Sequence, residues 1–170
     1  MPGVDGAAAG GEGGGPGTEA GTFDIRFISD EVESLAEFLG EGAWGLRGRI
    51  TLGEYVEEFL ALLGTWTRED YERQWAQAAR RLVDGADRTA FFTSAYEFRW
   101  TLWRVGDRVV AQEHFLTAEH FPEPFDPDDL YTHIQDRRTR TDDGASISEW
   151  TLDLAGVAAF AARAPHPPTG

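Results

Sequence analysis

Short stretches in which apolar and polar residues alternate constrain the fold more than any other feature of this chain. Alternation with a period of two is typical of strands that have one face in a core. Strands are predicted in this way at Phe23–Phe27, Leu46–Leu52, Phe98–Leu102 and Trp150–Leu154. Two further strands are predicted at Ala90–Ser94 and, as the return strand of a hairpin, at Arg108–Leu116. Gly106-Asp107 and Asp143-Gly144 supply hairpin turns. The pattern predicts an α+β fold, with an antiparallel β-sheet and a few helices packed on it in a single domain.

One helix is predicted together with both of its ends. Thr67 and Asp70 have the spacing of a capping box with Asp in place of Glu or Gln, and Gly85 fits the position beyond a helix C-terminus. Trp66 and Tyr71 occupy the two staple positions beside the cap. One apolar stripe runs between these ends, so the helix is expected to pack on the sheet. The stripe contains Tyr71, Trp75, Ala78 and Leu82.

Three other helices are predicted from single features. Ser29 has the character of an N-cap for a short helix that ends at Gly40. Asp126 before Pro127 predicts a helix start, and the Ala-rich segment Ala155–Ala164 predicts a last helix. Residues 54–63 have apolar positions that fit either a helix or an edge strand, and this alternative stays open.

The composition changes at both ends of the chain. Residues 1–21 are rich in Gly, Ala and Pro and contain no aromatic residue, so they are expected to form a disordered tail. Residues 22–163 carry the strand and helix patterns and are expected to form the domain. Residues 164–170 include three prolines and are expected to be a frayed C-terminal tail.

The chain is strongly acidic. Its formal net charge is −15, and residues 22–170 carry −12 because the preceding acidic residues Asp5, Glu12 and Glu19 have no basic counterpart there. Such a charge repels nucleic acid and anionic membranes and attracts a basic protein. There is no cysteine, no apolar run of about 18 residues and no signal-peptide pattern. We therefore expect a cytoplasmic protein that binds neither nucleic acid nor membrane.

No pattern of catalytic or metal-ligating residues is complete. Asp126, Asp128 and Asp129 begin like a calcium loop, but Tyr131 and Arg137 stand where an EF-hand needs a glycine and an acidic residue. The four histidines lack a metal-binding spacing, and no serine lies in a strand–turn–helix elbow. The expectation is a protein that is not an enzyme and has no metal or other cofactor.

Trp103 lies on the opposite strand face from Trp100 and Leu102. It is expected either to cover a second layer of structure or to anchor a partner, because aromatic residues dominate interface hot spots. Two further functions stay open on the residues alone. One is a small-molecule-binding or enzymatic domain with a pocket lined by Trp103, Tyr96 and His114. The other is a scaffold that homodimerises through its sheet.

Six short motifs follow one another in a fixed order. They are Trp66-Thr67-Arg68-Glu69-Asp70-Tyr71-Glu72-Arg73-Gln74-Trp75; Gly106-Asp107-Arg108-Val109; Gln112-Glu113; Pro124-Phe125-Asp126-Pro127; Tyr131-Thr132-His133-Ile134; and Asp143-Gly144 with Ile147-Ser148-Glu149-Trp150. This ordered set resembles the immunity proteins of bacterial contact-dependent growth inhibition systems.

The resemblance implies an antitoxin-like protein that binds and neutralises a cognate toxin domain, often a nuclease, by covering it and without catalysis. A nuclease is basic because it holds phosphate, so the acidic charge of this chain fits such a partner. Binding residues are expected at Trp103 and among acidic residues placed on loops. Those acidic residues are Glu119, Glu123, Asp128, Asp129, Asp142 and Asp143. The protein is expected to be a monomer or a weak homodimer.

Overall fold

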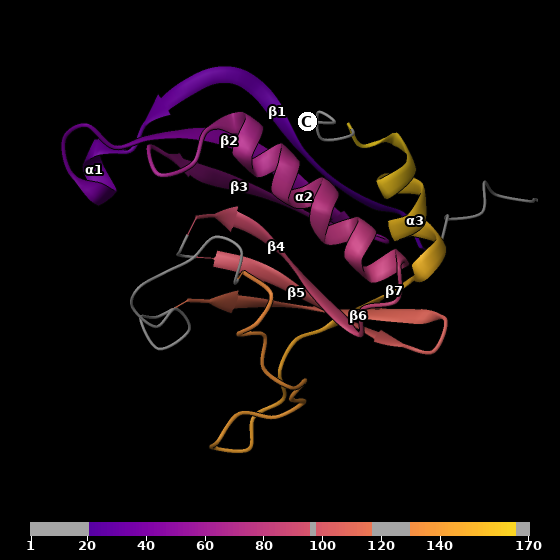
Figure 1. The fold of residues 1–170 in the computed structure, drawn as a ribbon. Coiled ribbons are helices and arrows are strands. Elements are labelled where there is room, and N and C mark those ends of the chain that lie inside the picture. Colours follow the sequence, from indigo (N-terminus) through magenta and orange to yellow (C-terminus); the bar gives the residue numbers. More distant parts are fainter. Residues whose placement is uncertain (1–20, 96–97, 117–129, 166–170) are drawn as a thin grey trace, which may run out of the picture.

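Two antiparallel sheets form the framework of the protein in a computed structural model that describes residues 21–95, 98–116 and 130–165 (Figure 1). The first sheet has the order β1 (Phe23–Ser34), β2 (Trp44–Leu52), β3 (Tyr55–Leu63). The second has the order β4 (Arg88–Ser94), β5 (Phe98–Val105), β6 (Arg108–Phe115), β7 (Trp150–Asp153). The predicted α+β class with antiparallel strands is confirmed, and the strands divide between two sheets.

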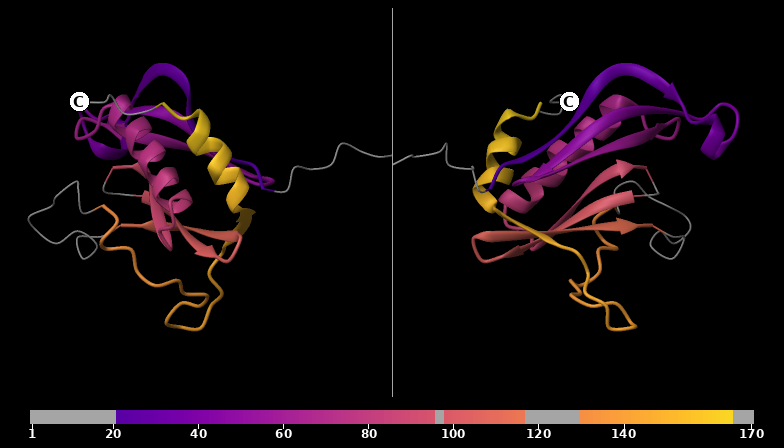
Figure 2. Two further views of the ribbon diagram at one scale, coloured as in Figure 1. Left: turned by 45° about the vertical axis from the view of Figure 1, so that its right-hand side comes forward. Right: turned by 180° about the vertical axis from the view of Figure 1, so that it is seen from behind.

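The helices of the described chain lie on one side and at both ends of these sheets. α1 (Ala36–Leu39) is a single turn that projects at one end, α2 (Arg68–Val83) lies across both sheets, and α3 (Leu154–Arg163) packs against α2 and β1 at the other end (Figures 1 and 2). The capping box predicted for α2 is present, because the Thr67 side chain accepts from Asp70 N while the Asp70 carboxylate accepts from Thr67 N at 2.9 Å.

Aromatic side chains join the sheets and helices into one core. The rings of Phe27 on β1 and Trp75 on α2 lie 4.9 Å apart, and Phe23 lies 4.8 Å from Phe91 on β4. Trp100 on β5 contacts Trp150 on β7 at 5.2 Å. Full burial of one such side chain contributes about 1.5–3 kcal/mol, so these contacts account for much of the packing energy between the layers.

Side chains of α2 hydrogen-bond the backbone of β3, of β4 at its edge facing away from β5, and of Ala95 just after β4. The Tyr71 hydroxyl donates to Leu62 O and accepts from Ala95 N, both at 2.7 Å. The Trp75 indole N–H donates to Phe92 O at 2.8 Å. A strand edge normally needs a neighbouring strand or water for these groups. Here the helix supplies the partners, so the second sheet ends at β4.

The short helix predicted between Ser29 and Gly40 is present as α1 and ends at Gly40 as expected, but its predicted start at Ser29 is wrong. β1 continues to Ser34, and its register with β2 shifts between the pairs Phe27–Gly48 and Val32–Leu46. Four residues of β1 therefore lie opposite a single residue of β2, as a bulge. Ser29 Oγ accepts from Glu31 N at 3.0 Å inside this bulge, because serine can satisfy the backbone of an irregular strand as well as that of a helix end.

The structure also decides the other expectations about elements. Residues 54–63 form a turn followed by β3, so the strand alternative is correct, and Leu154 begins α3 instead of ending β7. Asp143-Gly144 is a turn, but only one isolated bridge, between Arg140 and Ser146, flanks it. The helix start at Asp126, the first 20 residues and residues 166–170 lie outside the described residues. The first two residues of the predicted C-terminal tail are hydrogen-bonded to α2, because Arg80 Nη2 donates to the carbonyl oxygens of Ala164 and Pro165.

Candidate functional site

Large apolar side chains are exposed at the end of the molecule where α1 projects and where β1, β4 and β6 finish (Figures 1 and 2). We call this surface the aromatic end. Its members and their exposed fractions are Val32 50%, Phe38 79%, Leu39 50%, Trp44 48%, Phe98 38% and Phe115 64%. The ends of β6 and β5 meet there, with the rings of Phe98 and Phe115 5.1 Å apart. Exposed large apolar side chains gathered at one end of a protein are candidates for an interaction site.

Acidic side chains surround the part of the aromatic end that α1 carries. Residues 30–44 contain five acidic residues and no basic residue. Asp30 pairs with Arg68, and Glu33 makes a two-bond pair with Arg47 at 2.8 and 2.9 Å, which raises the pKa of Arg47. Among the described residues, the ion pairs of this segment use these two acids and leave Glu31, Glu37 and Glu41 without one. This tip therefore combines exposed aromatic surface with negative charge.

The acidic residues predicted for partner binding are only partly placed. Glu119, Glu123, Asp128 and Asp129 lie outside the described residues. Asp142 and Asp143 are exposed on the turn after Thr141. Arg138 pairs with Asp142 at 2.5 Å, and the Thr141 hydroxyl donates to Asp143 and lowers the pKa of that carboxyl. Arginines at 137, 138 and 140 lie beside this turn, so its charge is mixed.

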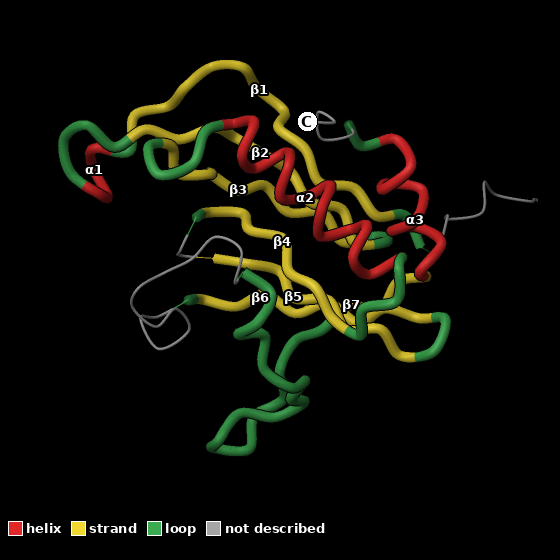
Figure 3. The backbone as a smooth tube through the Cα atoms, viewed as in Figure 1, coloured by secondary structure: helices red, strands yellow, loops and turns green. Residues whose placement is uncertain are grey.

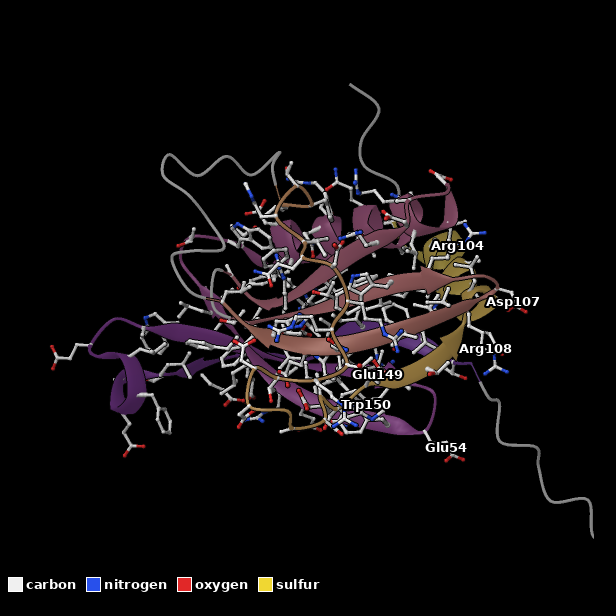
Figure 4. All side chains as sticks on the ribbon, turned by 90° about the horizontal axis from the view of Figure 1, so that it is seen from below. Glu54, Arg104, Asp107, Arg108, Glu149 and Trp150 are labelled. Atoms are coloured by element: carbon white, nitrogen blue, oxygen red, sulfur yellow. The ribbon has the colours of Figure 1, made fainter. Side chains whose placement is uncertain are left out.

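Residues 134–149, which we call the covering segment, run beside the second sheet (Figures 3 and 4). Trp103 contacts this segment. Its side chain is 6% exposed, and its indole N–H donates to Gln135 O at 3.2 Å. Gln112 Nε2 donates to Arg138 O at 2.8 Å and to Glu149 at 3.0 Å. Trp103 was expected either to cover a second layer of structure or to anchor a partner. In the structure it packs against the covering segment, which forms such a second layer outside the main core.

A small polar cavity lies between the second sheet and the covering segment. Its volume is about 140 Å³, and it is lined by Arg99, Thr101, Trp103, Gln112, His114, Gln135, Asp136, Arg138 and Ile147. Trp103 and His114, two residues of the predicted pocket, contact one another there with ring centres 5.7 Å apart. Tyr96, the third, lies outside the described residues. The lining is more polar than the aromatic pocket expected from sequence.

The described part of the chain gives no sign of a metal site or a membrane span. It contains no group of three or more His, Asp or Glu side chains placed to hold a metal ion. None of its helices is long and apolar enough to cross a bilayer. The Thr101 hydroxyl is hydrogen-bonded to His114 Nδ1 at 3.0 Å, and both residues line the cavity.

Sequence reasoning missed two features of these sites. It did not identify Phe38 and Leu39 as surface residues, whereas both lie exposed in α1. It also passed over Arg99, which the alternation puts on the same strand face as Trp103. Arg99 could have indicated the cavity, because it lies on the strand face of Trp103, which one of the two alternatives expected a second layer to cover.

Comparison with known proteins assigns the chain to a family. Residues 61–160, more than half of the chain, match the family model described as the CdiI N-terminal domain. The chain belongs to this family. The immunity protein CdiI of Enterobacter cloacae subsp. cloacae is 29% identical over 118 residues, which cover 65% of this chain and 81% of that protein. The resemblance to immunity proteins of contact-dependent growth inhibition is thus confirmed.

A solved structure from the same family has the same fold. The structure is described as the CdiA-CT/CdiI toxin and immunity complex from Enterobacter cloacae. One chain of it superimposes with a TM-score of 0.72 and 28% identity, covering 83% of this chain and 97% of that chain. The likeness therefore extends over nearly the whole of the matched chain.

The motifs that carried the resemblance hold the CdiI fold together. Tyr71 and Trp75 bond β3, β4 and the residue after β4, as described above. Gln112 and Glu149 tie the covering segment to β6, and Glu149 also pairs with Arg137 at 2.5 Å. The match to the family model begins in β3 and so does not include α1. The family motifs accordingly explain the scaffold, and the aromatic end lies partly outside them.

Proposed function

We propose that this protein is an immunity protein that binds a cognate toxin domain in the cytoplasm and neutralises it by covering it. The observation that carries the proposal is the structural likeness, at a TM-score of 0.72 over 97% of the matched chain, to a chain from a toxin and immunity complex. The 29% identity to a protein named immunity protein CdiI supports it. Neutralisation by covering needs no catalysis by this chain.

The charge of the protein favours a basic partner. Residues 22–170 carry −12, because Asp5, Glu12 and Glu19 account for three of the 15 net negative charges. A toxin that cuts nucleic acid holds phosphate and is therefore basic, so the two proteins would attract one another over several ångströms of solvent. Within our proposal, the toxin is a basic nuclease, and the immunity protein competes with its nucleic-acid substrate.

The aromatic end is the contact surface that fits this role best. Interface hot spots are formed by aromatic residues in a patch that excludes water, with charged residues at the rim. Phe38 and Trp44 supply the aromatic groups, and Glu31, Glu37 and Glu41 supply the negative rim. Acidic residues 119, 123, 128, 129, 142 and 143 are proposed as further rim positions. Trp103 contributes through the covering segment that it supports.

Capture and rescue test the proposal directly. Tagged protein is incubated with a lysate of its native host, and products of neighbouring genes are tested for binding. We expect capture of a basic domain that arrests growth when expressed alone and is harmless when this chain is co-expressed. The matched control is CdiI of Enterobacter cloacae, which shares the fold but is only 29% identical and should not rescue. Failure to capture such a domain from a lysate that contains it would refute the proposal.

A further inference from the structure

Arg99 is a buried arginine without an acidic partner in the described structure. Its exposed fraction is 2%, and its Nη2 donates only to the carbonyl oxygen of His133, at 3.3 Å. The other two guanidinium nitrogens, Nε and Nη1, are buried and have no hydrogen-bond partner. Burial, with no compensating carboxylate, lowers the pKa of Arg99 to about 10. Buried arginines are normally paired with an acid because an isolated buried charge is unfavourable.

The surroundings of Arg99 explain why the charge is not satisfied within the chain. Arg99 pairs across the sheet with His114, and both line the cavity together with Thr101 and Gln112. Asp136 is the single carboxylate among the described lining residues, and it pairs with Arg88 at 2.9 Å. Its side chain is 92% exposed, so it belongs to the rim of the cavity. The base of the cavity therefore carries positive charge and hydrogen-bond donors.

The size of the cavity limits what can enter. Its volume of about 140 Å³ exceeds the roughly 10–15 Å³ required by one water molecule. It is well below the roughly 300–1,000 Å³ of pockets that bind drug-sized ligands. A guanidinium group presents its donors as a planar fork that matches the oxygens of carboxylate and phosphate. Only a small group with this geometry would fit the space and use the free donors.

We propose that the cavity under the covering segment is a binding site for a small free oxyanion, of the phosphate or carboxylate class, held by Arg99. Gln112 and His114 frame the site from β6, and Arg138, which is ion-paired with Asp142, lines it from the covering segment. An ion bound there would join the second sheet to the covering segment, because Arg99 and Gln112 come from the sheet while Arg138 comes from the segment. The site does not depend on the proposed immunity function.

The test compares wild-type protein with Arg99→Gln and Arg108→Gln. Arg108 is an exposed arginine at the β5–β6 hairpin (Figure 4) and is not part of the cavity lining, so it controls for loss of one positive charge. Melting temperature and calorimetric binding are measured with inorganic phosphate and with acetate, against chloride at equal ionic strength. The acetate and phosphate arms show which oxyanion class is preferred.

We expect at least one of the two anions to raise the melting temperature of wild type and of Arg108→Gln in a saturable manner. Arg99→Gln should lose that shift while melting, in chloride, no lower than Arg108→Gln, because it removes an unpaired buried charge. Arg99→Lys, which keeps the charge and loses the fork, should bind the anion more weakly. The proposal is overturned if neither anion binds wild type, or if Arg99→Gln keeps the full shift. Failure of Arg99→Gln and Arg99→Lys to fold in chloride would show that Arg99 is structural, and would also overturn it.

Discussion

Gln74 on α2 hydrogen-bonds the backbone of Phe92 on β4 in the way that a neighbouring strand would. Its Oε1 accepts from Phe92 N at 3.1 Å, and its Nε2 donates to Ala90 O at 2.6 Å. Backbone groups of residues two apart on a strand point to the same side, so the Ala90 carbonyl and the Phe92 N–H both face α2. One side-chain amide can therefore make the two hydrogen bonds that a residue of a neighbouring strand would make. Gln74 is 4% exposed, and water therefore cannot replace it. At this edge of the second sheet, Gln74 supplies the hydrogen bonds to Phe92 N and Ala90 O, and Trp75 supplies the one to Phe92 O.

Replacing Gln74 with Leu should destabilise the protein strongly. Leucine has a similar size to glutamine but cannot form hydrogen bonds, so Phe92 N and Ala90 O would remain buried without hydrogen-bond partners. Each such group costs about 1–3 kcal/mol. The free energy of unfolding, measured with urea, should fall by at least that amount for Gln74→Leu. Gln77→Leu is the control, because Gln77 is exposed on the same helix and accepts only from the Tyr131 hydroxyl. Equal losses in the two variants would contradict the role assigned to Gln74.

Asp70 should stabilise α2 in a pH-dependent way. Its carboxylate accepts from Thr67 N, and this bond lowers the pKa of Asp70. A carboxyl whose pKa is lower in the folded state stabilises the protein above its unfolded pKa of about 3.9. That contribution disappears as the pH falls through the folded-state pKa.

We therefore expect Asp70→Ala to lower the free energy of unfolding by about 0.5–2 kcal/mol near neutral pH, the range found for lost N-caps. The difference from wild type should shrink towards zero at acidic pH, as the pH falls through the lowered folded-state pKa of Asp70. Glu69→Ala removes the same charge from the same first turn without removing the cap, so it should lose less. Urea unfolding at both pH values measures this, and a loss that is the same at low pH would exclude the carboxylate as its cause.

The sequence predicts α2 well because everything that defines it is local. Thr67, Asp70 and Gly85 mark its ends, and its apolar stripe is buried as expected. The separation into two sheets was not predictable, because it depends on Tyr71, Gln74 and Trp75 reaching strand edges 16 to 24 residues away along the chain. Alternation identifies a strand, but it does not show which strands pair.

The proposed partner-binding surface was also hard to predict, because it too depends on contacts between residues that are far apart in the sequence. Phe38 lies in α1, which begins at Ala36 because β1 continues through a bulge to Ser34, and a bulge is recognised only by the pairing of β1 with β2. The burial of Trp103 depends on the covering segment, which has almost no regular structure and therefore no periodic pattern. The negative charge of the protein could be predicted from the sequence alone, because net charge does not depend on the fold.

Reversing the acidic turn should slow association with the toxin if it lies at the rim of the interface. Rim charges act mainly on association rate and its salt dependence. For Asp142→Lys/Asp143→Lys we expect about a several-fold slower association at low salt, with little change at high salt. Glu54→Lys/Asp107→Lys changes the same number of charges at the end opposite α1 (Figure 4). Surface plasmon resonance at two salt concentrations compares them. If the two double variants slow association equally, the association rate depends on the total charge of the protein and not on the position of the acidic turn.

The same comparison extends to the acidic residues that the structure does not describe. Glu119, Glu123, Asp128 and Asp129 are reversed together with Asp142 and Asp143. If the toxin affinity of this six-residue variant equals that of wild type, these loops are not part of the interface.

Phe38 should be a main anchor of the toxin complex. Its side chain is 79% exposed, so truncation costs the free protein little, within about 0.5 kcal/mol. Buried against a partner, an aromatic anchor is worth far more, and Phe38→Ala should weaken binding at least about tenfold, or about 1.4 kcal/mol. Val105→Ala is the control, because Val105 is 51% exposed at the opposite end, beside the β5–β6 turn. Its affinity should stay within about twofold of wild type by calorimetry. If both variants bind like wild type while the toxin is still neutralised, the interface lies elsewhere and the exposure of Phe38 needs another explanation.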